Sequence, residues 1–322
     1  MILAIAYEGE EHTAGVLEAL RREGREVVQM DMGDFPANNG VSLSWSGEVD
    51  ASYRVHTRAG EVDLTQVNVG WWRRVRPFVI DPAIRRPMDA AFVQSETSQA
   101  VNGMLDALDC PWVNPREADA SAHHKPYQWA VAQRLGLRVP RTMVTSDPGE
   151  AKRFIEEIGV GKVVFKAFLA SIEDWRETRL VEAADVERLE LVRYAPVIFQ
   201  EYIPGVDLRI TVVGDEVFTG EIDAQKTSYP VDMRMVVGEA KVQAIELPEK
   251  LRARLLALQK RLQLVYGAID MRRTPEGEYY FLEVNPAGQW HFVEHRTGLP
   301  ITKAMADLLA RYDDAGRGEA KA

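Results

Sequence analysis

The pattern of apolar and polar positions in the first thirty residues predicts a strand, a helix and a second strand. Residues 2–7 and 26–30 are apolar runs of strand length. Between them apolar side chains recur at helical spacing, and Thr13 is the expected N-cap of this helix. The apolar positions are Val16, Leu17 and Leu20. A β-α-β order is typical of a parallel sheet. The acidic turn after residue 7 lacks the pattern G-x-G-x-x-G, which argues against a dinucleotide-binding domain.

Residues 67–115 continue this α/β domain. Residues 67–75 predict a strand that carries two tryptophans followed by two arginines, and residues 88–108 have helical spacing. The tryptophan and arginine pairs are typical either of nucleic-acid binding or of arginine stems packed over aromatic rings, and the acidic chain favours packing. Prolines at 111 and 115 indicate a domain boundary, so the first domain is expected to span 1–115.

The second predicted domain spans residues 116–196. Its expected elements are a helix through Leu135, a strand at 142–145, a helix at 148–158 and a strand at 162–166. Lys166 ends an apolar strand, and a lysine in this position either extends into solvent or meets an anion. His123 and His124 are adjacent, so their side chains diverge, and no third ligand is near. We therefore discount a zinc site.

The third predicted domain spans residues 197–312 and is rich in strands. Its expected elements are strands at 197–203 and 206–217, a helix at 248–265, a hairpin with strands at 266–271 and 279–284, and a helix at 301–312. Residues 313–322 are polar and are expected to form a disordered tail.

The predicted hairpin places two acidic side chains nearly opposite each other. If the turn pairs the strands about Glu276, Asp270 falls nearly opposite Glu283, and Asn285 shares a face with Glu283 because side chains alternate along a strand. Like charges in this position repel, so a cation is expected between them. Such oxygen ligands suit Mg²⁺, which proteins hold with one or two carboxylates and substrate phosphates. The alternative is a hairpin with a solvated acidic face.

The composition of the chain excludes several classes of protein. A length of 322 residues with 46% apolar content is enough for two or three domains with buried cores. A formal charge of -10 argues against nucleic-acid and anionic-membrane partners. One cysteine, Cys110, excludes an internal disulfide and fits a reducing compartment. The first apolar run is short and lacks a basic leader, so we expect neither a signal peptide nor a membrane span, and a cytoplasmic protein.

The order of polar residues along the chain resembles the ATP-grasp superfamily. The residues that carry the resemblance are Lys125, Lys166, Gln200, Glu201, Tyr202, Ile203, Asp207, Arg209, Asp270, Glu283 and Asn285. The resemblance covers residues 115–312, and the preceding residues are compatible with the α/β domain that precedes the grasp in this superfamily. It implies an α/β (α+β) ATP-grasp fold with an N-terminal pre-ATP-grasp domain (1–115), a central lid domain (116–196) and a C-terminal antiparallel-sheet domain (197–312).

Within the superfamily, several motifs resemble the peptide maturases that make graspetides, which are microviridin-type peptides with ω-ester or ω-amide links. The motifs are WWRRVRPF at 71–78, WRETRLV at 175–181, a second D-x-R pair at Asp232 and Arg234, and NPAGQW at 285–290. Ribosomal-protein glutamate ligases are the nearest general relatives. The resemblance implies that the partner is a ribosomal precursor peptide, whose leader binds the central domain, and we expect the chain to act as a homodimer.

The resemblance also implies which residues bind ATP and metal. Lys125 and Lys166 would bind the α and β phosphates as point charges. The segment Gln200, Glu201, Tyr202 and Ile203 would be the hinge that reads adenine, and Asp207 would accept hydrogen bonds from the ribose. Mg²⁺, as one or two ions, would be held by Asp270, Glu283 and Asn285.

Three arginines have implied catalytic roles. Arg209 would stabilise the charge that develops on the transferred phosphoryl group. Arg234 and Arg272 would bind the substrate carboxylate in bidentate fashion. For Arg272 an ion pair with Glu283 or Asp270 is the alternative.

The implied reaction is phosphoryl transfer from ATP to an Asp or Glu side chain, followed by attack of a hydroxyl or amine on the acyl phosphate. Two alternatives stay open. The first is a ligase that adds glutamate or another amino acid to a protein or small molecule, and the second is a nucleotide-binding regulator without turnover. One feature departs from the superfamily: the loop Ala167 to Thr178 contains no glycine. It could close the site through Arg176 or Arg179 instead.

Overall fold

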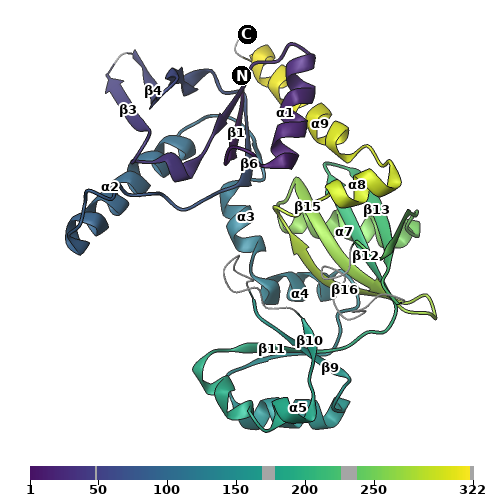
Figure 1. The fold of residues 1–322 in the computed structure, drawn as a ribbon. Coiled ribbons are helices and arrows are strands. Elements are labelled where there is room, and N and C mark those ends of the chain that lie inside the picture. Colours follow the sequence, from purple (N-terminus) through teal and green to yellow (C-terminus); the bar gives the residue numbers. More distant parts are fainter. Residues whose placement is uncertain (48, 169–177, 226–237, 320–322) are drawn as a thin grey trace. The chain divides into compact units, whose positions relative to one another are not determined.

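The structure, a computed structural model, describes residues 1–47, 49–168, 178–225 and 238–319 (Figure 1). The chain divides into two compact units, Met1–Ala118 with Pro300–Ala322, and Asp119–Leu299. The helix α3 (Arg116–Ala122) contains the first division. None of the helices in these described ranges combines the length and the apolar character that crossing a membrane requires.

A four-stranded parallel sheet of order β2-β1-β6-β7 forms the centre of the first unit. Its strands are β1 (Ile2–Ala6), β2 (Val27–Met30), β6 (Val69–Arg74) and β7 (Trp112–Val113). Every residue of β1 is buried, as expected for a central strand covered on both faces. The predicted β-α-β beginning is therefore confirmed.

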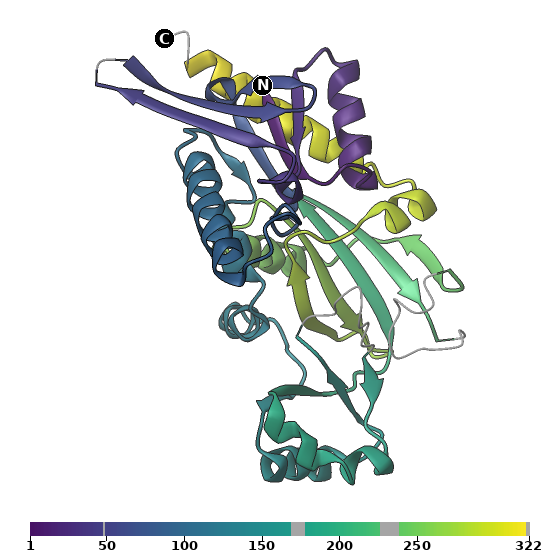
Figure 2. The same ribbon diagram turned by 60° about the vertical axis from the view of Figure 1, so that its left-hand side comes forward.

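Helices from both ends of the sequence cover this sheet. Helix α1 (Glu11–Arg22) lies beside α9 (Ile301–Glu319) in both views (Figures 1 and 2). The C-terminal part of α2 (Pro87–Asp106) packs into the same core as Leu3 and Ile5. The remaining elements are the antiparallel strands β3 (Gly40–Ser46), β4 (Val49–Thr57) and β5 (Gly60–Asp63), and the 3₁₀ helices η1 (Met32–Asp34) and η2 (Leu64–Gln66).

Helix α1 begins earlier than predicted, because Glu10 and not Thr13 is its N-cap. The Glu10 carboxylate accepts hydrogen bonds from the backbone N–H and the hydroxyl of Thr13, both at 2.7 Å. Burial alone would raise the pKa of Glu10, but hydrogen bonds from His12 and Thr13 and the charge of Arg73 bring that pKa far below its ordinary value. Ser, Thr, Asp and Asn are the usual N-caps, which is why the pattern pointed to Thr13.

Two of the four side chains in the tryptophan and arginine pairs at 71–74 are buried, and the other two are half-buried. Trp71 is 1% exposed and Arg73 is 2% exposed, so neither can stack on or bind a nucleic acid. The guanidinium of Arg116 lies 4.8 Å from the ring centroid of Trp72. Packing, rather than nucleic-acid binding, is thus confirmed for Trp71 and Arg73, but the arginine that lies over Trp72 is Arg116 and not one of the predicted pair.

The C-terminal segment corrects the expectation of a disordered tail. Helix α9 continues to Glu319, so the expectation is wrong for residues 313–319, and residues 320–322 lie outside the described part of the chain. The reason is Asp313, which is fully buried and accepts hydrogen bonds from Asn68 (2.7 Å) and the amino group of Met1 (3.0 Å). Both partners are distant in sequence, so the local composition gave no sign of them.

Replacing Asp313 with Asn should lower the free energy of unfolding by about 2 kcal/mol at neutral pH. Burial alone would raise the pKa of Asp313, but hydrogen bonds from Asn68, the amino group of Met1 and Arg317 lower it from 3.8 to about 2. A carboxyl with a lowered pKa stabilises the fold above its unfolded pKa and loses this contribution as pH falls towards the folded pKa. The difference between wild type and D313N, measured by urea unfolding, should therefore shrink between pH 4 and pH 2.

The matched control is Asp314→Asn, because Asp314 forms an exposed ion pair with Arg25. Exposed ion pairs contribute little to stability because water screens them, so D314N should have the smaller effect. Equal losses in the two variants would contradict the structural role assigned to Asp313.

The second unit contains a four-stranded antiparallel sheet of order β10-β9-β11-β8. Helix α5 covers one face of it, through Phe154 and Ile155, which share a core with Val163 and Phe199 (Figures 1 and 2). The elements are β8 (Thr142–Thr145), α5 (Pro148–Ile158), β9 (Val163–Lys166), β10 (Arg179–Leu180), α6 (Ala183–Val186), η3 (Leu189–Tyr194) and β11 (Val197–Glu201).

A five-stranded antiparallel sheet of order β14-β13-β12-β15-β16 completes the second unit. Its strands are β12 (Val206–Val213), β13 (Glu216–Asp223), β14 (Lys241–Ala244), β15 (Tyr266–Arg273) and β16 (Tyr279–Asn285). The helices beside it are α4 (Lys125–Arg134), α7 (Glu249–Arg261) and α8 (His291–Thr297). The predicted hairpin is confirmed, with Asp270 directly opposite Glu283.

Candidate functional site

The predicted metal ligands and two predicted catalytic arginines lie on one face of the five-stranded sheet. Arg209 of β12 pairs with Asp270 of β15, and Asp270 pairs with Glu283 of β16. Paired residues of antiparallel strands project to the same face, as do residues two positions apart on one strand. The further residues of this face are Asp207, Arg272 and Asn285.

The opposite face of the sheet forms the core. Leu208, Ile210 and Ile269, at the alternate positions, are buried. A Cβ added at Gly267, also on this face, would lie 2.3 Å from the Gln259 side chain of α7, so that helix packs closely against the sheet. The apolar face fixes the strands, and the other face can therefore carry charged groups.

Each carboxylate on the charged face has a cationic partner. Arg209 Nη1 lies 2.7 Å from Asp270 Oδ1, and Lys125 of α4 forms an ion pair with Glu283. The repulsion expected between Asp270 and Glu283 is relieved by these two side chains, which belong to this chain itself. The charged groups on this face are only partly solvated, so the attraction within each pair is stronger than between exposed charges.

Arg272 occupies a different place from either of its predicted positions. Its Nε lies 3.5 Å from Asp207 Oδ1, and its Nη2 donates to the carbonyl of Gly205 at 2.8 Å. Its guanidinium also lies 5.1 Å from the ring centroid of Tyr202. The predicted alternative, an ion pair with Glu283 or Asp270, is therefore wrong, because Arg272 pairs with Asp207, while Glu283 and Asp270 pair with other cations. In this arrangement Arg272 links the 202–205 segment to the sheet.

Arg209 is held by the NPAGQW motif. Its Nη2 and Nε donate to the carbonyl of Gln289 at 3.0 and 3.3 Å. The turn around Gly288 packs on the sheet, because Tyr266 donates its hydroxyl to the Gly288 carbonyl at 2.7 Å and Trp290 is fully buried. Sequence reasoning did not identify the carbonyl of Gln289 as a partner, since a backbone group has no residue-specific signal.

Several polar groups of the predicted hinge already form hydrogen bonds within the second unit. Gln200 is buried, accepts from Lys166 Nζ at 3.1 Å and donates to Thr142 at 2.8 Å. The backbone N–H groups of Glu201 and Tyr202 donate to neighbouring carbonyls at 2.8 Å each. Adenine would therefore have to be read by other backbone groups of this segment.

Some predicted residues cannot be placed. Asp232, Arg234 and Arg176 lie outside the described residues, as do positions 169–177 of the glycine-free loop. Arg179 lies on β10, where its guanidinium is 4.6 Å from the ring centroid of Phe165 and 2.9 Å from Asp185. In this structure Arg179 is therefore engaged within the four-stranded sheet.

Gly205, beside the charged face, should not tolerate a side chain. Its φ is +142°, and an added Cβ would lie 2.1 Å from the carbonyl oxygen of Arg273, a backbone atom that cannot move away easily. We expect Gly205→Ala to lower the free energy of unfolding by about 3 kcal/mol. Chemical denaturation of G205A would measure the loss.

The control for this substitution is Gly277→Ala in the hairpin turn. Gly277 also has a positive φ, of +84°, but no atom of the described residues lies within 4 Å of an added Cβ. G277A should therefore show only the backbone cost of about 1 kcal/mol. A G205A variant as stable as G277A would show that the close approach to Arg273 is unimportant.

The donor set on the charged face fits a magnesium ion that is shared with phosphates. Asp270 and Glu283 supply two carboxylates from neighbouring strands, and Asn285 supplies an amide oxygen. Among the residues that the structure describes, no group of three or more His, Cys, Asp or Glu side chains forms a metal cage of its own. Mg²⁺ is usually held by one or two carboxylates, with phosphates and water completing its octahedron, so the set suits this mode of binding.

Two family models match the chain. One, described as the MvdD pre-ATP grasp domain, matches residues 1–120. The other, described as the RimK-like ATP-grasp domain, matches residues 122–309, which is more than half of the chain. The chain belongs to the RimK-like ATP-grasp family. The predicted ATP-grasp fold with a pre-ATP-grasp domain is confirmed, while the internal boundaries at 115, 196 and 312 stay predictions.

Solved structures of RimK-like ATP-grasp relatives match almost the whole chain. The macrocyclase MdnC from Microcystis aeruginosa MRC, bound with precursor peptide MdnA, is 30% identical, with a TM-score of 0.84 over 96% of this chain and 98% of that chain. A RiPP-associated ATP-grasp ligase from Chryseobacterium gregarium, in complex with ADP and a leader and core peptide, is 28% identical, with a TM-score of 0.86 over 96% of both chains.

Curated relatives of this RimK-like ATP-grasp chain match over shorter spans. A D-alanine--D-alanine ligase of Aquifex aeolicus is 28% identical over 200 residues, which are 58% of this chain and 66% of that protein. A probable alpha-L-glutamate ligase of Shewanella halifaxensis is 22% identical over 66% of this chain and 47% of its own length. The chain thus spans just under two thirds of the first ligase and about half of the second.

Proposed function

We propose that the chain is an ADP-forming ligase that crosslinks a ribosomal precursor peptide. It phosphorylates Asp or Glu side chains of the peptide and joins them to Ser or Thr hydroxyls, or to Lys amines, as ω-esters or ω-amides. The observation that carries the proposal is the match to a peptide-bound macrocyclase over 96% of this chain, which includes both family segments and the charged face.

The chemistry requires activation of a carboxylate. A carboxylate is too poor an electrophile for an alcohol or amine at neutral pH, so its oxygen first attacks the γ-phosphorus of ATP, and ADP leaves. The hydroxyl or amine then attacks the carbonyl carbon of the acyl phosphate, loses a proton, and phosphate leaves. Catalysis of phosphoryl transfer consists mainly of positioning and charge stabilisation.

The charged face supplies the groups that this transfer needs. Asp270, Glu283 and Asn285 would hold one or two Mg²⁺ ions, which when bound offset the negative charge of the β and γ phosphates. Lys125 and Arg209, now paired with those carboxylates, would then interact with phosphate oxygens. Arg209 would stabilise the charge that develops during transfer.

The nucleotide and the peptide carboxylate would use the remaining predicted residues. Lys166 would bind the α and β phosphates, the segment Gln200, Glu201, Tyr202 and Ile203 would bind adenine, and Asp207 would bind the ribose. Arg234 and Arg272 would bind the substrate carboxylate, and Arg272 would first have to release Asp207.

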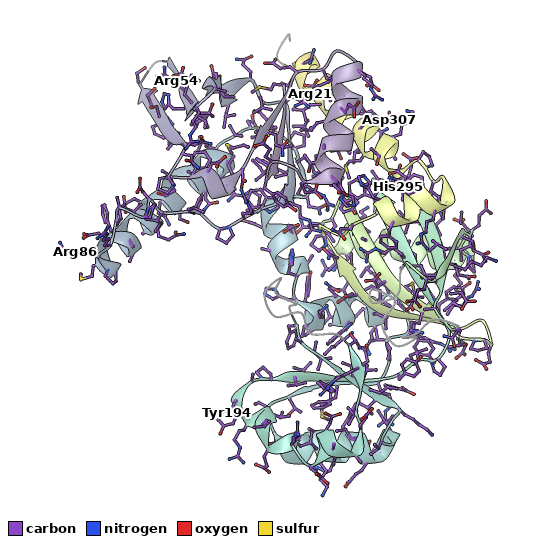
Figure 3. All side chains as sticks on the ribbon, in the orientation of Figure 1. Arg21, Arg54, Arg86, Tyr194, His295 and Asp307 are labelled. Carbon is purple, nitrogen blue, oxygen red and sulfur yellow. The ribbon has the colours of Figure 1, made fainter. Side chains whose placement is uncertain are left out.

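The precursor peptide would bind through its leader to residues 116–196. Solved relatives contain precursor peptides, which supports a peptide substrate. The region also exposes apolar side chains on η3: Leu191 is 62% exposed, and Tyr194, labelled in Figure 3, is 81% exposed. We also propose that the active form is a homodimer.

The test is incubation of the protein with ATP, Mg²⁺ and a candidate precursor peptide. We expect release of ADP and loss of the mass of one water molecule for each bond formed. AMP as product, or no mass loss with any candidate peptide, would contradict the proposal. The same mixture with Glu283→Ala protein is the control for adventitious ATP hydrolysis.

A ligase that adds a free amino acid is the second candidate, favoured only by the curated relatives, which match over part of their length. It predicts a gain of mass when glutamate is supplied, whereas crosslinking predicts a loss. A nucleotide-binding regulator without turnover predicts that Glu283→Ala leaves function intact.

A further inference from the structure

Gln128 of helix α4 is a buried polar residue outside the set predicted from the sequence. It is 1% exposed, and its carboxamide donates two hydrogen bonds and accepts one. Nε2 donates to the carbonyl of Val284 at 2.8 Å and to the carbonyl of Ala122, while Oε1 accepts from the backbone N–H of Val284 at 2.8 Å. Gln128 thus binds both backbone groups of one residue.

The residue that Gln128 binds lies between two predicted metal ligands. Val284 separates Glu283 from Asn285 on β16, which among the described strands is the edge strand of its sheet, next to β15. The carboxamide occupies the outer side of this strand and pairs with its backbone as another strand would. Its loss would leave a buried N–H and a buried carbonyl without their partner, next to the charged face.

Helix α4 also holds the other side of Glu283. The register shifts between Asp270 and Met271, so Leu282 is an extra residue in β16, and Trp129 Nε1 donates to the carbonyl of Leu282 at 2.8 Å. β-Bulges of this kind re-aim neighbouring side chains and are frequent beside active sites. The backbone is therefore fixed by α4 immediately before and immediately after Glu283.

The same helix supplies the charge partner of Glu283. Lys125 lies three residues before Gln128, so the two side chains share a face of α4. Lys125 pairs with the Glu283 carboxylate, and Gln128 holds the backbone that carries it. If Gln128 had only a packing role, we would not expect it to bind the backbone next to the same acidic residue with which Lys125 pairs.

We propose that Gln128 is a positioning residue of the magnesium site, which acts through the backbone of Val284 to orient Glu283 and Asn285. The inference rests on the proposed function, since it assumes that these side chains bind Mg²⁺ with a nucleotide. Residues that orient metal ligands typically change metal affinity by about 10–100-fold when they are replaced. Gln128 should act in this way although it touches neither ligand side chain.

The test is Gln128→Met, which keeps the length of the side chain and removes its hydrogen bonds. Calorimetry of ADP binding at increasing Mg²⁺ should show a half-saturating Mg²⁺ concentration raised by about 10-fold or more. ADP binding in EDTA should be unchanged, because the nucleotide contacts are intact. Hydrogen exchange of the Val284 amide in the ligand-free protein should be faster than in wild type.

Two further variants separate positioning from folding. Gln133→Met, at an exposed position of the same helix, should leave both the Mg²⁺ dependence and the exchange rate unchanged. Trp129→Phe keeps a ring in place but removes the bond to Leu282, and it should raise the half-saturating Mg²⁺ concentration to a smaller extent than Q128M. If Q128M does not fold, W129F tests the positioning role in its place.

The outcomes distinguish this inference from the proposed function. If wild type responds to Mg²⁺ but Q128M, or W129F in its place, shows the wild-type half-saturating concentration, the positioning role is overturned and the ligase proposal stands. If ADP binding by wild type is indifferent to Mg²⁺, the proposed function falls and the positioning role falls with it. A raised half-saturating Mg²⁺ concentration in Q128M, with ADP binding in EDTA unchanged, supports the positioning role.

Discussion

Replacing Glu283 with Gln should slow ADP formation on the order of 100-fold and raise the Mg²⁺ concentration that the reaction needs. The substitution preserves the size of the side chain and its position opposite Asp270, but it removes one of the two carboxylates that are predicted metal ligands. It also leaves Lys125 without its acidic partner, so the face becomes more positive and binds a divalent cation less well. Steady-state ADP release at a series of Mg²⁺ concentrations measures both effects.

The matched control is Glu278→Gln, on the same hairpin. Glu278 pairs with Arg138 and is substantially exposed, so its loss should change the rate little. If E283Q kept the wild-type dependence on Mg²⁺, the metal would have to be bound elsewhere, and the assignment of Asp270 and Asn285 would fail together with that of Glu283.

The hairpin that brings Asp270 close to Glu283 could be predicted because its pairing is local. Alternation along each strand and a turn with Pro275 and Gly277 predict the register next to the turn, which the structure has at Met271–Arg273, but the extra residue Leu282, which puts Glu283 directly opposite Asp270, had no signal in the sequence. The same holds for the beginning of the parallel sheet at β1, whose continuous apolar run is typical of a strand buried on both faces. Such patterns depend on neighbours in the sequence alone.

The partners of the charged groups could not be predicted, because they lie far away in the sequence. Gln128 and Val284 are separated by 156 residues, and Arg209 and Gln289 by 80. Helix α4 was recognised, but its buried residues include Gln128 and Trp129, which form no clear apolar stripe. The pattern therefore did not show which face of the helix meets β16.

The two facing carboxylates do need positive charge beside them, but the sequence did not show which cations of the chain supply it. Two carboxylates set across a sheet require positive charge, and the sequence pointed to Mg²⁺. In the structure Arg209 and Lys125 occupy that role, so a metal would exchange with side chains that are already in place. The charged face can therefore stay folded without metal, which an isolated acidic pair could not do without cost.

Arg209→Lys should lower kcat by about 100-fold while the KM values for ATP and peptide change much less. Arg209 reaches Asp270 with one nitrogen and the carbonyl of Gln289 with two others, so its guanidinium is fixed on both sides. Lysine keeps the charge but offers a single flexible donor group, which cannot hold both partners in one plane. An effect limited to kcat is the signature of an interaction made mainly in the transition state.

Two variants test whether the loss is catalytic. Arg252→Lys, on α7, should have the kcat of wild type, since the contacts of Arg252 within the described part of the chain are with a backbone carbonyl and a surface carboxylate. Arg209→Met, which removes the charge altogether, should be slower than R209K if charge on the phosphoryl group is what Arg209 stabilises. Thermal unfolding of R209K should stay close to that of wild type. If the melting temperature of R209K fell markedly as well as kcat, Arg209 would instead be a structural residue, needed to hold the turn at Gln289 against the sheet.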